Sequence, residues 1–459
     1  MAVIEPFAFQ RQGIAFLGER TGALLADDMG LGKTVQALLA CVADVRGPVL
    51  VIARPLNKQY WARMIAQLDP EASYLIASVG GRVDFKTVGM WFRPLRRAYL
   101  IVHHEALRFI EEELAKHTWH CVIADEAHRF KNRNAKMTKA LKRVPSLRRW
   151  ALTGTPMEKS PADFWSLLNW FDPKRFNGYW KFFDRFVQWV PSWGAKSASY
   201  QSYGPKVILG VKDPMGLAAE VGPYYLRRSK ADSGLDLPEK MYEDVPLEMP
   251  DYQHALYELV KKKVLVDLTA ADPSNEPLFI ANAISRIHYL TRVALDPSLL
   301  AGYNADPSDV GVKVKWLFDF AEDTDRPFVV FTHAKAFAHM LGDLIQGAGV
   351  ITGDVSLTDR NQVLSQFDLG ILRAIIGTTD TMSESVNLQR ATTAIFTDIH
   401  PSSIAMTQAE DRVHRIGSVL PVTIIRLNCI GTVDELFLQR LQKKWSDRQL
   451  VEAFLKGDV

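Results

Sequence analysis

With 459 residues, 47% of them hydrophobic, the chain is longer than one hydrophobic core usually serves, so two domains are expected. Its 55 Lys and Arg side chains nearly balance 52 Asp and Glu side chains, and the net charge of +3 therefore leaves recognition of any anionic partner to local basic patches. The cysteines Cys41, Cys121 and Cys429 show no metal-ligand spacing, which argues against a zinc site and against a disulfide framework.

The sequence shows no signal for export or for membrane insertion. No apolar run approaches the roughly 18 residues that a membrane span needs, and the start MAVIEPFAF lacks the basic and apolar regions of a signal peptide. We therefore expect a protein of a reducing compartment, cytoplasmic or associated with the nucleoid, with no membrane partner.

Short apolar runs separated by helical stretches predict buried parallel strands. In the first half of the chain these runs are residues 23–26, 49–53, 100–103, 121–125 and 150–153. In the second half they are residues 328–331, 372–377, 394–398 and 423–427. The pattern predicts two doubly wound α/β lobes, which we place at residues 1–240 and 241–459.

Two segments between the strand patterns are expected to form helical protrusions, at about residues 157–225 and 248–300. Residues 164–193 are crowded with aromatic side chains at helical spacing, which favours packing of a small subdomain, with stacking on nucleic-acid bases as the alternative. Residues 194–214 are rich in Gly, Ser, Lys and Tyr and predict a surface loop. A helical end is expected over residues 433–455.

All charged side chains between Arg129 and Arg149 are basic. Such a stretch is typical of a surface that contacts an anionic polymer, and the alternative is a solvated helix face.

Residues 27–34, DDMGLGKT, follow a predicted strand and precede an apolar helical stretch, which is the setting of a phosphate-binding loop. Gly30 and Gly32 let backbone N–H groups approach the phosphates of a nucleotide, and the positive end of the new helix adds to the attraction. We expect Lys33 to meet the β and γ phosphates and Thr34 to bind magnesium. The residues expected to bind ATP here are Asp28, Met29, Gly30, Leu31, Gly32, Lys33 and Thr34.

Residues 121–128, CVIADEAH, form an apolar strand that ends in two carboxylates, at the strand end where open α/β sheets bind their ligands. Asp125 is expected to hold magnesium. Glu126 is then placed to orient and deprotonate an attacking water, which leaves His128 to couple this centre to the other lobe.

These motifs, in this order, resemble helicase superfamily 2. The resemblance rests on Gln10 in FAFQRQG, DDMGLGKT, DEAHRFKN at 125–132, LTGTP at 152–156 and QAEDRVHRIG at 408–417. Smaller pieces are similar to the SWI/SNF branch in particular: YLRRSK at 225–230, LDLPEK at 235–240, ITGD at 351–354 and GTVDE at 431–435. The resemblance spans nearly the whole chain and implies two RecA-like lobes, ATP and magnesium as cofactors, and double-stranded DNA as the track.

The resemblance also implies roles for single residues. Gln10 should read the adenine edge, and the residues expected to couple ATP to DNA are His128, Thr153, Thr155 and Gln408. A track gripped by both lobes is held mainly through phosphates, so weak sequence preference is expected. The candidate DNA contacts are Arg54, Lys131, Asn132, His333, Thr378 and Thr379.

Gln408, Arg412 and Arg415 are spaced at i, i+4 and i+7 and are expected to share one helix face, beside an apolar stripe of Ala409, Val413 and Ile416. Two guanidiniums suit the charge that develops on a γ phosphate, as in an arginine finger. The alternative is a salt-bridged surface helix.

The sequence departs from the usual motifs at several positions. Asp27 stands where the strict phosphate-loop pattern has glycine, and Ser418 stands where the family usually has Gln. Met382, Ser383 and Ser385, in TMSESVNL, replace expected glycines. Backbone freedom is reduced there, so we expect either a different loop path or altered coupling of ATP to DNA.

The predicted function is an ATP-dependent motor that moves on double-stranded DNA without strand separation and remodels DNA structures or protein–DNA complexes. Forked or branched DNA and DNA-bound proteins are further candidate partners, and the targeting partner stays open. One alternative is a strand-separating helicase on DNA forks or RNA. Another is an ATP-gated nucleic-acid clamp, against which the intact Lys33, Asp125, Glu126, Arg412 and Arg415 argue.

Overall fold

The chain divides into two compact units, residues 1–235 and 236–459, with the division slightly before the expected boundary at residue 240. The computed structural model describes the whole chain except residues 1–4, 56, 79–81, 93–96, 158–159, 192–205, 236–237, 271–275, 301–305, 307–308, 384–385, 401, 416–417, 419, 444–446 and 457–459. Among the described residues, no helix combines the length and apolar character that crossing a membrane requires.

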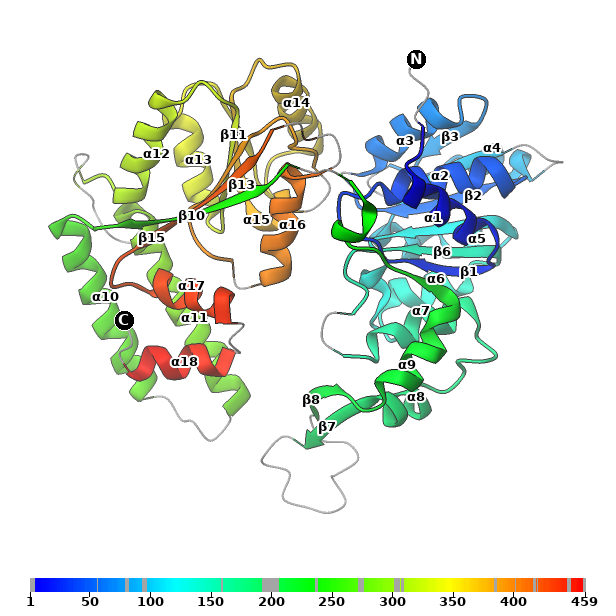
Figure 1. Cartoon of the computed structure of the whole chain (residues 1–459), viewed down its shortest axis with the longest axis horizontal. Coiled ribbons are helices and arrows are strands. Elements are labelled where there is room, and N and C mark those ends of the chain that lie inside the picture. The colour runs from blue at the N-terminus through cyan, green and yellow to red at the C-terminus, as the bar shows by residue number, and fades with distance from the viewer. Residues whose placement is uncertain are drawn as a thin grey trace. The chain divides into compact units, whose positions relative to one another are not determined.

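The first unit is built on a seven-stranded parallel sheet with the order β3-β4-β2-β5-β6-β1-β9 (Figure 1). Its strands are β1 (Gly22–Leu25), β2 (Val49–Ala53), β3 (Ser73–Ile76), β4 (Ala98–His103), β5 (Trp119–Asp125), β6 (Ser146–Leu152) and β9 (Tyr225–Leu226). Its helices before the aromatic segment are α1 (Ala8–Gly18), α2 (Lys33–Asp44), α3 (Asn57–Leu68), α4 (Phe85–Trp91), α5 (Leu107–Leu114) and α6 (Lys136–Arg143).

Both faces of this sheet are buried. On β1, Leu24 packs into one hydrophobic cluster and Ala23 and Leu25 into another, because successive side chains of a strand point to opposite faces. This two-sided burial explains why the strands read as continuous apolar runs. The five strands expected in this half are confirmed, whereas β3 and β9 were missed because β3 is partly exposed and β9 is very short.

The aromatic segment packs onto the first unit, which supports packing over base stacking for most of its rings. It forms α7 (Asp163–Phe171), α8 (Tyr179–Phe186), the antiparallel hairpin β7 (Val187–Pro191) and β8 (Lys206–Val211), and α9 (Pro214–Val221). Trp165, Trp170 and Phe182 are buried in the cluster that also contains Leu24. The expected helical protrusion contains α7, α8 and α9, and it also contains this hairpin. The expected loop over residues 194–214 was wrong toward its end, because Lys206–Val211 form β8 and pair with β7.

The second unit is built on a six-stranded parallel sheet with the order β10-β15-β14-β11-β13-β12. Its strands are β10 (Lys240–Leu247), β11 (Phe328–Thr332), β12 (Ala348–Ile351), β13 (Ala374–Thr378), β14 (Thr393–Phe396) and β15 (Val422–Cys429). Its helices are α10 (Asp251–Thr269), α11 (Glu276–Leu295), α12 (Val312–Asp323), α13 (Lys335–Leu344), α14 (Leu357–Asp368), α15 (Thr379–Met382), α16 (Ser403–Val413), α17 (Val433–Lys443) and α18 (Asp447–Lys456). Two doubly wound α/β lobes are thereby confirmed.

The segment expected to be helical at about residues 248–300 contains α10 and α11, and its inner side chains are joined to the core of the second unit. Tyr257 of α10 and Ile287 and Leu290 of α11 are fully buried in the same cluster as Phe331 of β11 and Phe396 of β14. In Figure 1, α10 and α11 extend below the sheet and lie with α17 and α18. The helical end is present as α17 and α18, which pack against α11.

A buried ion pair ties the segment after β9 to the end of β1. The Arg228 guanidinium donates to both carboxylate oxygens of Asp27, from Nε to Oδ1 at 3.0 Å and from Nη2 to Oδ2 at 2.5 Å. The Asp27 side chain is fully buried, and the Arg228 side chain is 9% exposed. The backbone N–H of Asp28 also donates to the Arg228 carbonyl oxygen at 2.9 Å. This pairing explains why a carboxylate stands where the usual phosphate-loop pattern has glycine.

Replacing Arg228 by Met should lower the free energy of unfolding of the first unit by roughly 3–5 kcal/mol, because the Asp27 carboxylate then stays buried without its partner. Denaturant unfolding followed by tryptophan fluorescence measures this change. Arg227 is the matched control, since its side chain is half exposed and lies 3.5 Å from Asp28. Arg227→Met should cost no more than about 1 kcal/mol, and equal losses in the two variants would contradict the account.

Candidate functional site

The loop between β1 and α2 has the backbone of a phosphate-binding loop. Gly30 and Gly32 adopt φ values of 85° and 72°, a left-handed conformation that favours glycine. A Cβ at Gly32 would also lie 2.6 Å from Nε2 of Gln10, so a side chain there would displace the end of the Gln10 side chain. The Lys33 ammonium donates to the carbonyl oxygens of Asp27 at 2.6 Å and of Asp28 at 3.1 Å. An incoming phosphate must therefore compete with two carbonyl oxygens for this lysine.

Gln10 and Gln36 brace the same loop from two helices. The Gln10 side chain is buried, accepts from the Phe7 N–H at 3.1 Å and donates to the Leu31 carbonyl oxygen at 3.2 Å. Gln36 donates to Leu31 at 3.1 Å and accepts from Arg228 at 2.9 Å. Gln10 is thus beside the loop as predicted, and its role toward adenine stays a prediction. Gln36 and Arg228 were missed as parts of this site, although YLRRSK had marked Arg228 as a family residue.

Asp125, the last residue of β5, has a buried carboxylate held by three donors. Its Oδ2 accepts from Nε1 of Trp61 at 3.0 Å and from Nδ2 of Asn57 at 3.4 Å, and its Oδ1 accepts from the Glu126 N–H at 3.0 Å. Burial raises the pKa of Asp125 above its ordinary value, and the Glu126 carboxylate adds to this rise, whereas the Trp61 hydrogen bond and the charge of Lys33 oppose it. A cation at this carboxylate favours its charged form. Trp61 and Asn57 lie in α3, far from the motif in sequence, and were missed.

Glu126 has a strained backbone. Its φ of 48° and ψ of 49° make it the one non-glycine residue with positive φ in the described part of the chain. Such strain persists only where the surroundings impose it, and it is typical of functional sites. Here the fully buried His104 ring donates from Nε2 to the carbonyl oxygen of Asp125 at 2.8 Å. Burial lowers the pKa of His104 to about 3, so this ring is a neutral brace behind the acidic pair.

The structure brings together the coupling residues that were predicted in the first unit. Nδ1 of His128 is hydrogen-bonded to Oγ1 of Thr153 at 3.0 Å and to Oγ1 of Thr155 at 3.4 Å, and it lies 3.5 Å from Oε2 of Glu126. The Thr155 N–H donates to Oγ1 of Thr153 at 3.1 Å. The ends of β5, β6 and β1, which are neighbours in the sheet, thus carry the acidic pair, the threonines and the phosphate loop.

We predicted that Gln408, Arg412 and Arg415 share one helix face, and this prediction was wrong for Arg415. Helix α16 ends at Val413, and His414 has extended backbone angles of −98° and 94°. The Ser418 hydroxyl accepts from the Arg415 N–H at 3.2 Å and donates to the Val413 carbonyl oxygen at 3.1 Å, which closes a turn and takes Arg415 off the helix. The apolar stripe holds for the buried Ala409 and Val413, while Ile416 lies outside the described residues.

Two of the three residues that replace expected glycines lie at the end of a short helix. Met382 lies in α15, and neither it nor Ser383 has positive φ, so glycine is not needed at these two positions. The Met382 side chain is fully buried, and a Cβ at Gly377 would lie 2.9 Å from its sulfur. Arg412 donates from Nε to the Ser383 carbonyl oxygen at 2.8 Å, so this turn is joined to α16. Ser385 lies outside the described residues.

The candidate DNA contacts divide by burial. The side chains of Arg54, Thr378 and Thr379 are buried, and Oγ1 of Thr379 donates to the Thr332 carbonyl oxygen at 3.4 Å. Direct phosphate contacts from these side chains are not favoured by this structure. Asn132 and His333 are exposed, and Lys131 is half-buried.

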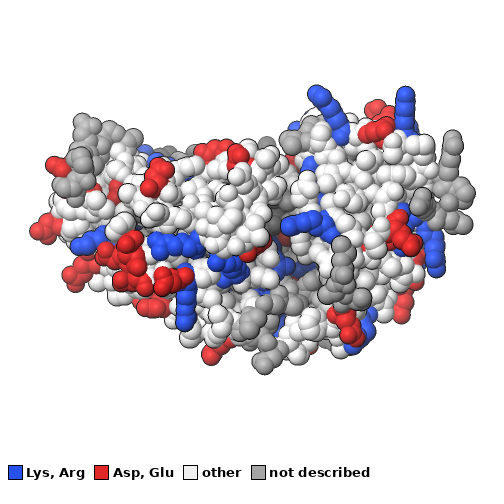
Figure 2. All heavy atoms as spheres, turned by 90° about the horizontal axis from the view of Figure 1, so that it is seen from above, with Lys and Arg blue, Asp and Glu red and all other residues white. Residues whose placement is uncertain are grey.

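The basic stretch is partly structural. Arg129 pairs with Glu105 at 2.5 Å and Arg143 with Glu111 at 2.7 Å, while Arg149 donates to the Trp170 carbonyl oxygen at 2.9 Å. On the face seen in Figure 2, Lys and Arg side chains are interspersed with Asp and Glu. The alternative of a solvated helix face fits α6, where the basic residues Lys136, Lys139 and Arg143 are exposed.

Comparison with known proteins bears on both units. Residues 9–299 match the model of the SNF2-related domain, and residues 312–417 match the helicase conserved C-terminal domain. The ISWI chromatin-remodeling complex ATPase ISW1 of Saccharomyces cerevisiae is 26% identical over 475 residues, covering 96% of this chain and 40% of the yeast protein. The human DNA excision repair protein ERCC-6 is 24% identical over 501 residues, covering 99% of this chain and 32% of that protein. An uncharacterized ATP-dependent helicase of Mycoplasma genitalium is 24% identical over 465 residues, covering 98% of this chain and 42% of the Mycoplasma protein.

The chain spans less than half the length of these relatives. Among solved structures, the Sulfolobus solfataricus SWI2/SNF2 ATPase core in complex with dsDNA is 22% identical, with a TM-score of 0.44, and covers 100% of this chain and 96% of that chain. The match to the SNF2-related domain alone covers more than half of the sequence. The chain belongs to the SNF2-related family.

Proposed function

We propose that the chain is a DNA-dependent ATPase that moves along double-stranded DNA without separating the strands, and that it remodels DNA structures or protein–DNA complexes by this movement. The observation that supports this most is the assembly at one sheet edge of a phosphate loop, two adjacent carboxylates and the hydrogen-bonded His128, Thr153 and Thr155. Relatives named as a chromatin-remodeling ATPase and a DNA excision repair protein support DNA as the track.

Asp125 and Thr34 fit a magnesium ion, because hard oxygen donors are the ligands that this ion prefers. The raised pKa of Asp125 also fits a site that is completed by a cation. The ion would neutralise phosphate charge. Lys33 then exchanges its two carbonyl partners for phosphate oxygens, and Glu126 takes a proton from the attacking water. Arg412 and Arg415 are proposed to stabilise the charge that develops on the γ phosphate.

A cavity of about 340 Å³ supports a DNA-contacting role for the region after β5. It is lined by Lys131, Asn132, Arg133 and Trp180 among others. The Arg133 guanidinium lies over the Tyr179 ring, 4.1 Å from its centroid, which fixes the cation beside the exposed Trp180. Lys131, Asn132 and His333 remain proposed as phosphate contacts.

Glu126→Gln should leave ATP and magnesium bound and reduce turnover by about 10²–10⁴-fold, because the amide cannot accept the proton of the water. Lys33→Ala should instead weaken nucleotide binding. Equilibrium binding of a fluorescent ATP analogue and steady-state phosphate release separate the two defects. Glu113→Gln is the control, at a half-exposed position of α5 where the carboxylate pairs only with Lys116 among the ion pairs of the described residues. Wild-type turnover of Glu126→Gln would assign water activation to another residue.

Arg415→Ala should bind ATP nearly normally and lose about 10³–10⁵-fold in turnover, because the charge that it neutralises grows only toward the transition state. Arg415→Lys should not restore the rate, since an ammonium does not reproduce a planar fork. The same comparison for Arg412→Ala includes the loss of its hydrogen bond to Ser383, so its thermal unfolding must be measured as well. Near-normal turnover in both alanine variants would make these arginines structural.

Duplex DNA should stimulate ATP hydrolysis more than single-stranded DNA or RNA does. Binding to the duplex should weaken steeply with salt, because each neutralised phosphate releases counterions. Turnover measured against duplex, single-stranded, forked and RNA cofactors, together with a salt titration of DNA affinity, checks both statements. Stimulation by RNA alone, or affinity that is flat with salt, would contradict a motor that grips duplex phosphates.

A further inference from the structure

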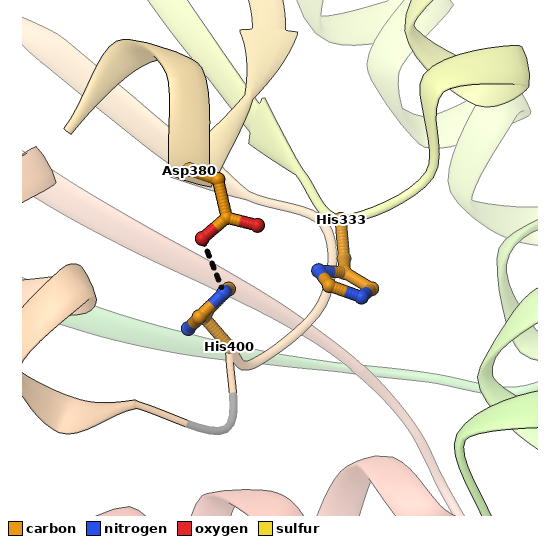
Figure 3. Close-up of side chains that lie close together, drawn as sticks. All are labelled: His333, Asp380 and His400. Carbon is orange, nitrogen blue, oxygen red and sulfur yellow. Dashed lines mark ion pairs between the residues drawn. The ribbon is translucent and has the colours of Figure 1, made fainter. Parts of the chain in front are cut away.

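Three side chains with metal-binding atoms converge at the carboxyl edge of the second unit's sheet (Figure 3). His333 directly follows β11, Asp380 lies in α15 directly after β13, and His400 follows β14. Because β14, β11 and β13 are neighbours in a parallel sheet, their carboxyl ends meet at this edge. One ligand atom of each residue lies within 4.8 Å of the other two. Among the described residues it is the one group of at least three such side chains, and the proposed ATPase uses His333 only as a candidate phosphate contact and not as a metal ligand.

The ligand atoms of these three side chains lie nearly as close together as they would around a bound cation. Nε2 of His400 lies 3.0 Å from Oδ1 of Asp380, and the rings of His333 and His400 meet edge to face with centroids 5.4 Å apart. Tetrahedral bonds of about 2.0–2.1 Å to a zinc ion place ligand atoms roughly 3.3 Å apart. His333 and Asp380 are exposed, so rotation of their side chains can bring the third ligand atom in.

The backbone behind the cluster is fixed. The His333 N–H donates to both carboxylate oxygens of the buried Asp398 at 3.0 Å. The fully buried Lys313 donates from Nζ to the Thr397 carbonyl oxygen at 2.6 Å and to Asp434 at 2.5 Å. Side chains can therefore turn while the strand ends stay in place, which lowers the ordering cost of binding a ligand between them.

The donor set selects the class of ion. Imidazole nitrogens suit zinc and similar transition-metal dications, whereas magnesium prefers oxygen ligands. Two histidines and one carboxylate fill three positions of a tetrahedral site and leave one open to solvent.

Binding requires one rearrangement at His400. Its Nδ1 accepts from the Ser402 N–H at 3.0 Å, so the proton of the neutral ring is on Nε2 and is shared with Asp380. A cation on Nε2 moves this ring proton to Nδ1, and the imidazole then has to turn so that its new N–H no longer faces the Ser402 N–H. We propose that His333, Asp380 and His400 form a binding site for one zinc-class dication with one coordination position open to solvent.

The test is a titration of the full chain with Zn²⁺ against a chromogenic zinc indicator, in excess magnesium so that oxygen-rich sites are occupied. Wild-type protein should take up one Zn²⁺ per chain in competition with the indicator. Asp380→Asn and His333→Gln should each weaken this binding at least about tenfold, since even the loss of groups that only support metal ligands costs that much. Co²⁺ in place of Zn²⁺ should give the intense visible bands of a tetrahedral ion.

His339 is the matched control, because its Nε2 lies 3.3 Å from Asp354 in the same unit and no third metal-binding side chain among the described residues joins this pair. His339→Gln should leave Zn²⁺ affinity unchanged. Both test positions are exposed, and equal thermal unfolding of all variants shows that lost binding is not lost folding. Absence of stoichiometric uptake, or an affinity that the Asp380 and His333 variants leave unchanged, would overturn the proposal and leave the cluster as a hydrogen-bonded His–Asp pair.

Discussion

Parallel pairing brings the carboxyl ends of neighbouring strands to the same edge of a sheet, and the phosphate loop, the acidic pair and the threonines of the first unit depend on this constraint. The phosphate loop follows β1, the acidic pair ends β5, and the threonines follow β6. These strands are far apart in the sequence but adjacent in the sheet. The same rule in the second unit gathers His333, Asp380 and His400. Because both faces of the first unit's sheet are buried, this edge is the place where polar side chains can converge.

Two buried carboxylates at the phosphate-loop end of the sheet, those of Asp27 and Asp125, are held by hydrogen bonds. Asp27 is compensated by the bidentate Arg228, and Gln36 is hydrogen-bonded to both of them. Asp125 has donors from Trp61 and from the backbone of Glu126. Such groups are costly to bury singly, and in a satisfied network they hold the loop and the carboxylates in one geometry. That preorganisation is what a phosphoryl-transfer site needs, since its catalysis consists mainly of positioning and charge stabilisation.

The sequence predicted the strands that are long and apolar on both faces, and it predicted the residues that stand directly on motifs. It missed Trp61, Asn57, Gln36 and Arg228, because their roles come from contacts across the fold and not from spacing along the chain. The prediction that Arg412 and Arg415 share a helix face was wrong, because the helix ends at Val413, whose carbonyl oxygen accepts from the Ser418 hydroxyl. The sequence also did not predict the cluster of His333, Asp380 and His400. These residues are far apart along the chain, and only the order of the strands in the sheet brings them together. Roles in catalysis and DNA contact stay predictions.

Displacement of a third strand measures movement of the chain along an intact duplex most directly. A blunt duplex carrying a short triplex-forming oligonucleotide, far from either end, reports passage of a motor without requiring strand separation. With ATP, the wild-type chain should release the third strand and leave the two duplex strands paired, and Glu126→Gln should release neither. Release of a duplex strand at a comparable rate, or third-strand release that proceeds without ATP, would contradict translocation on double-stranded DNA.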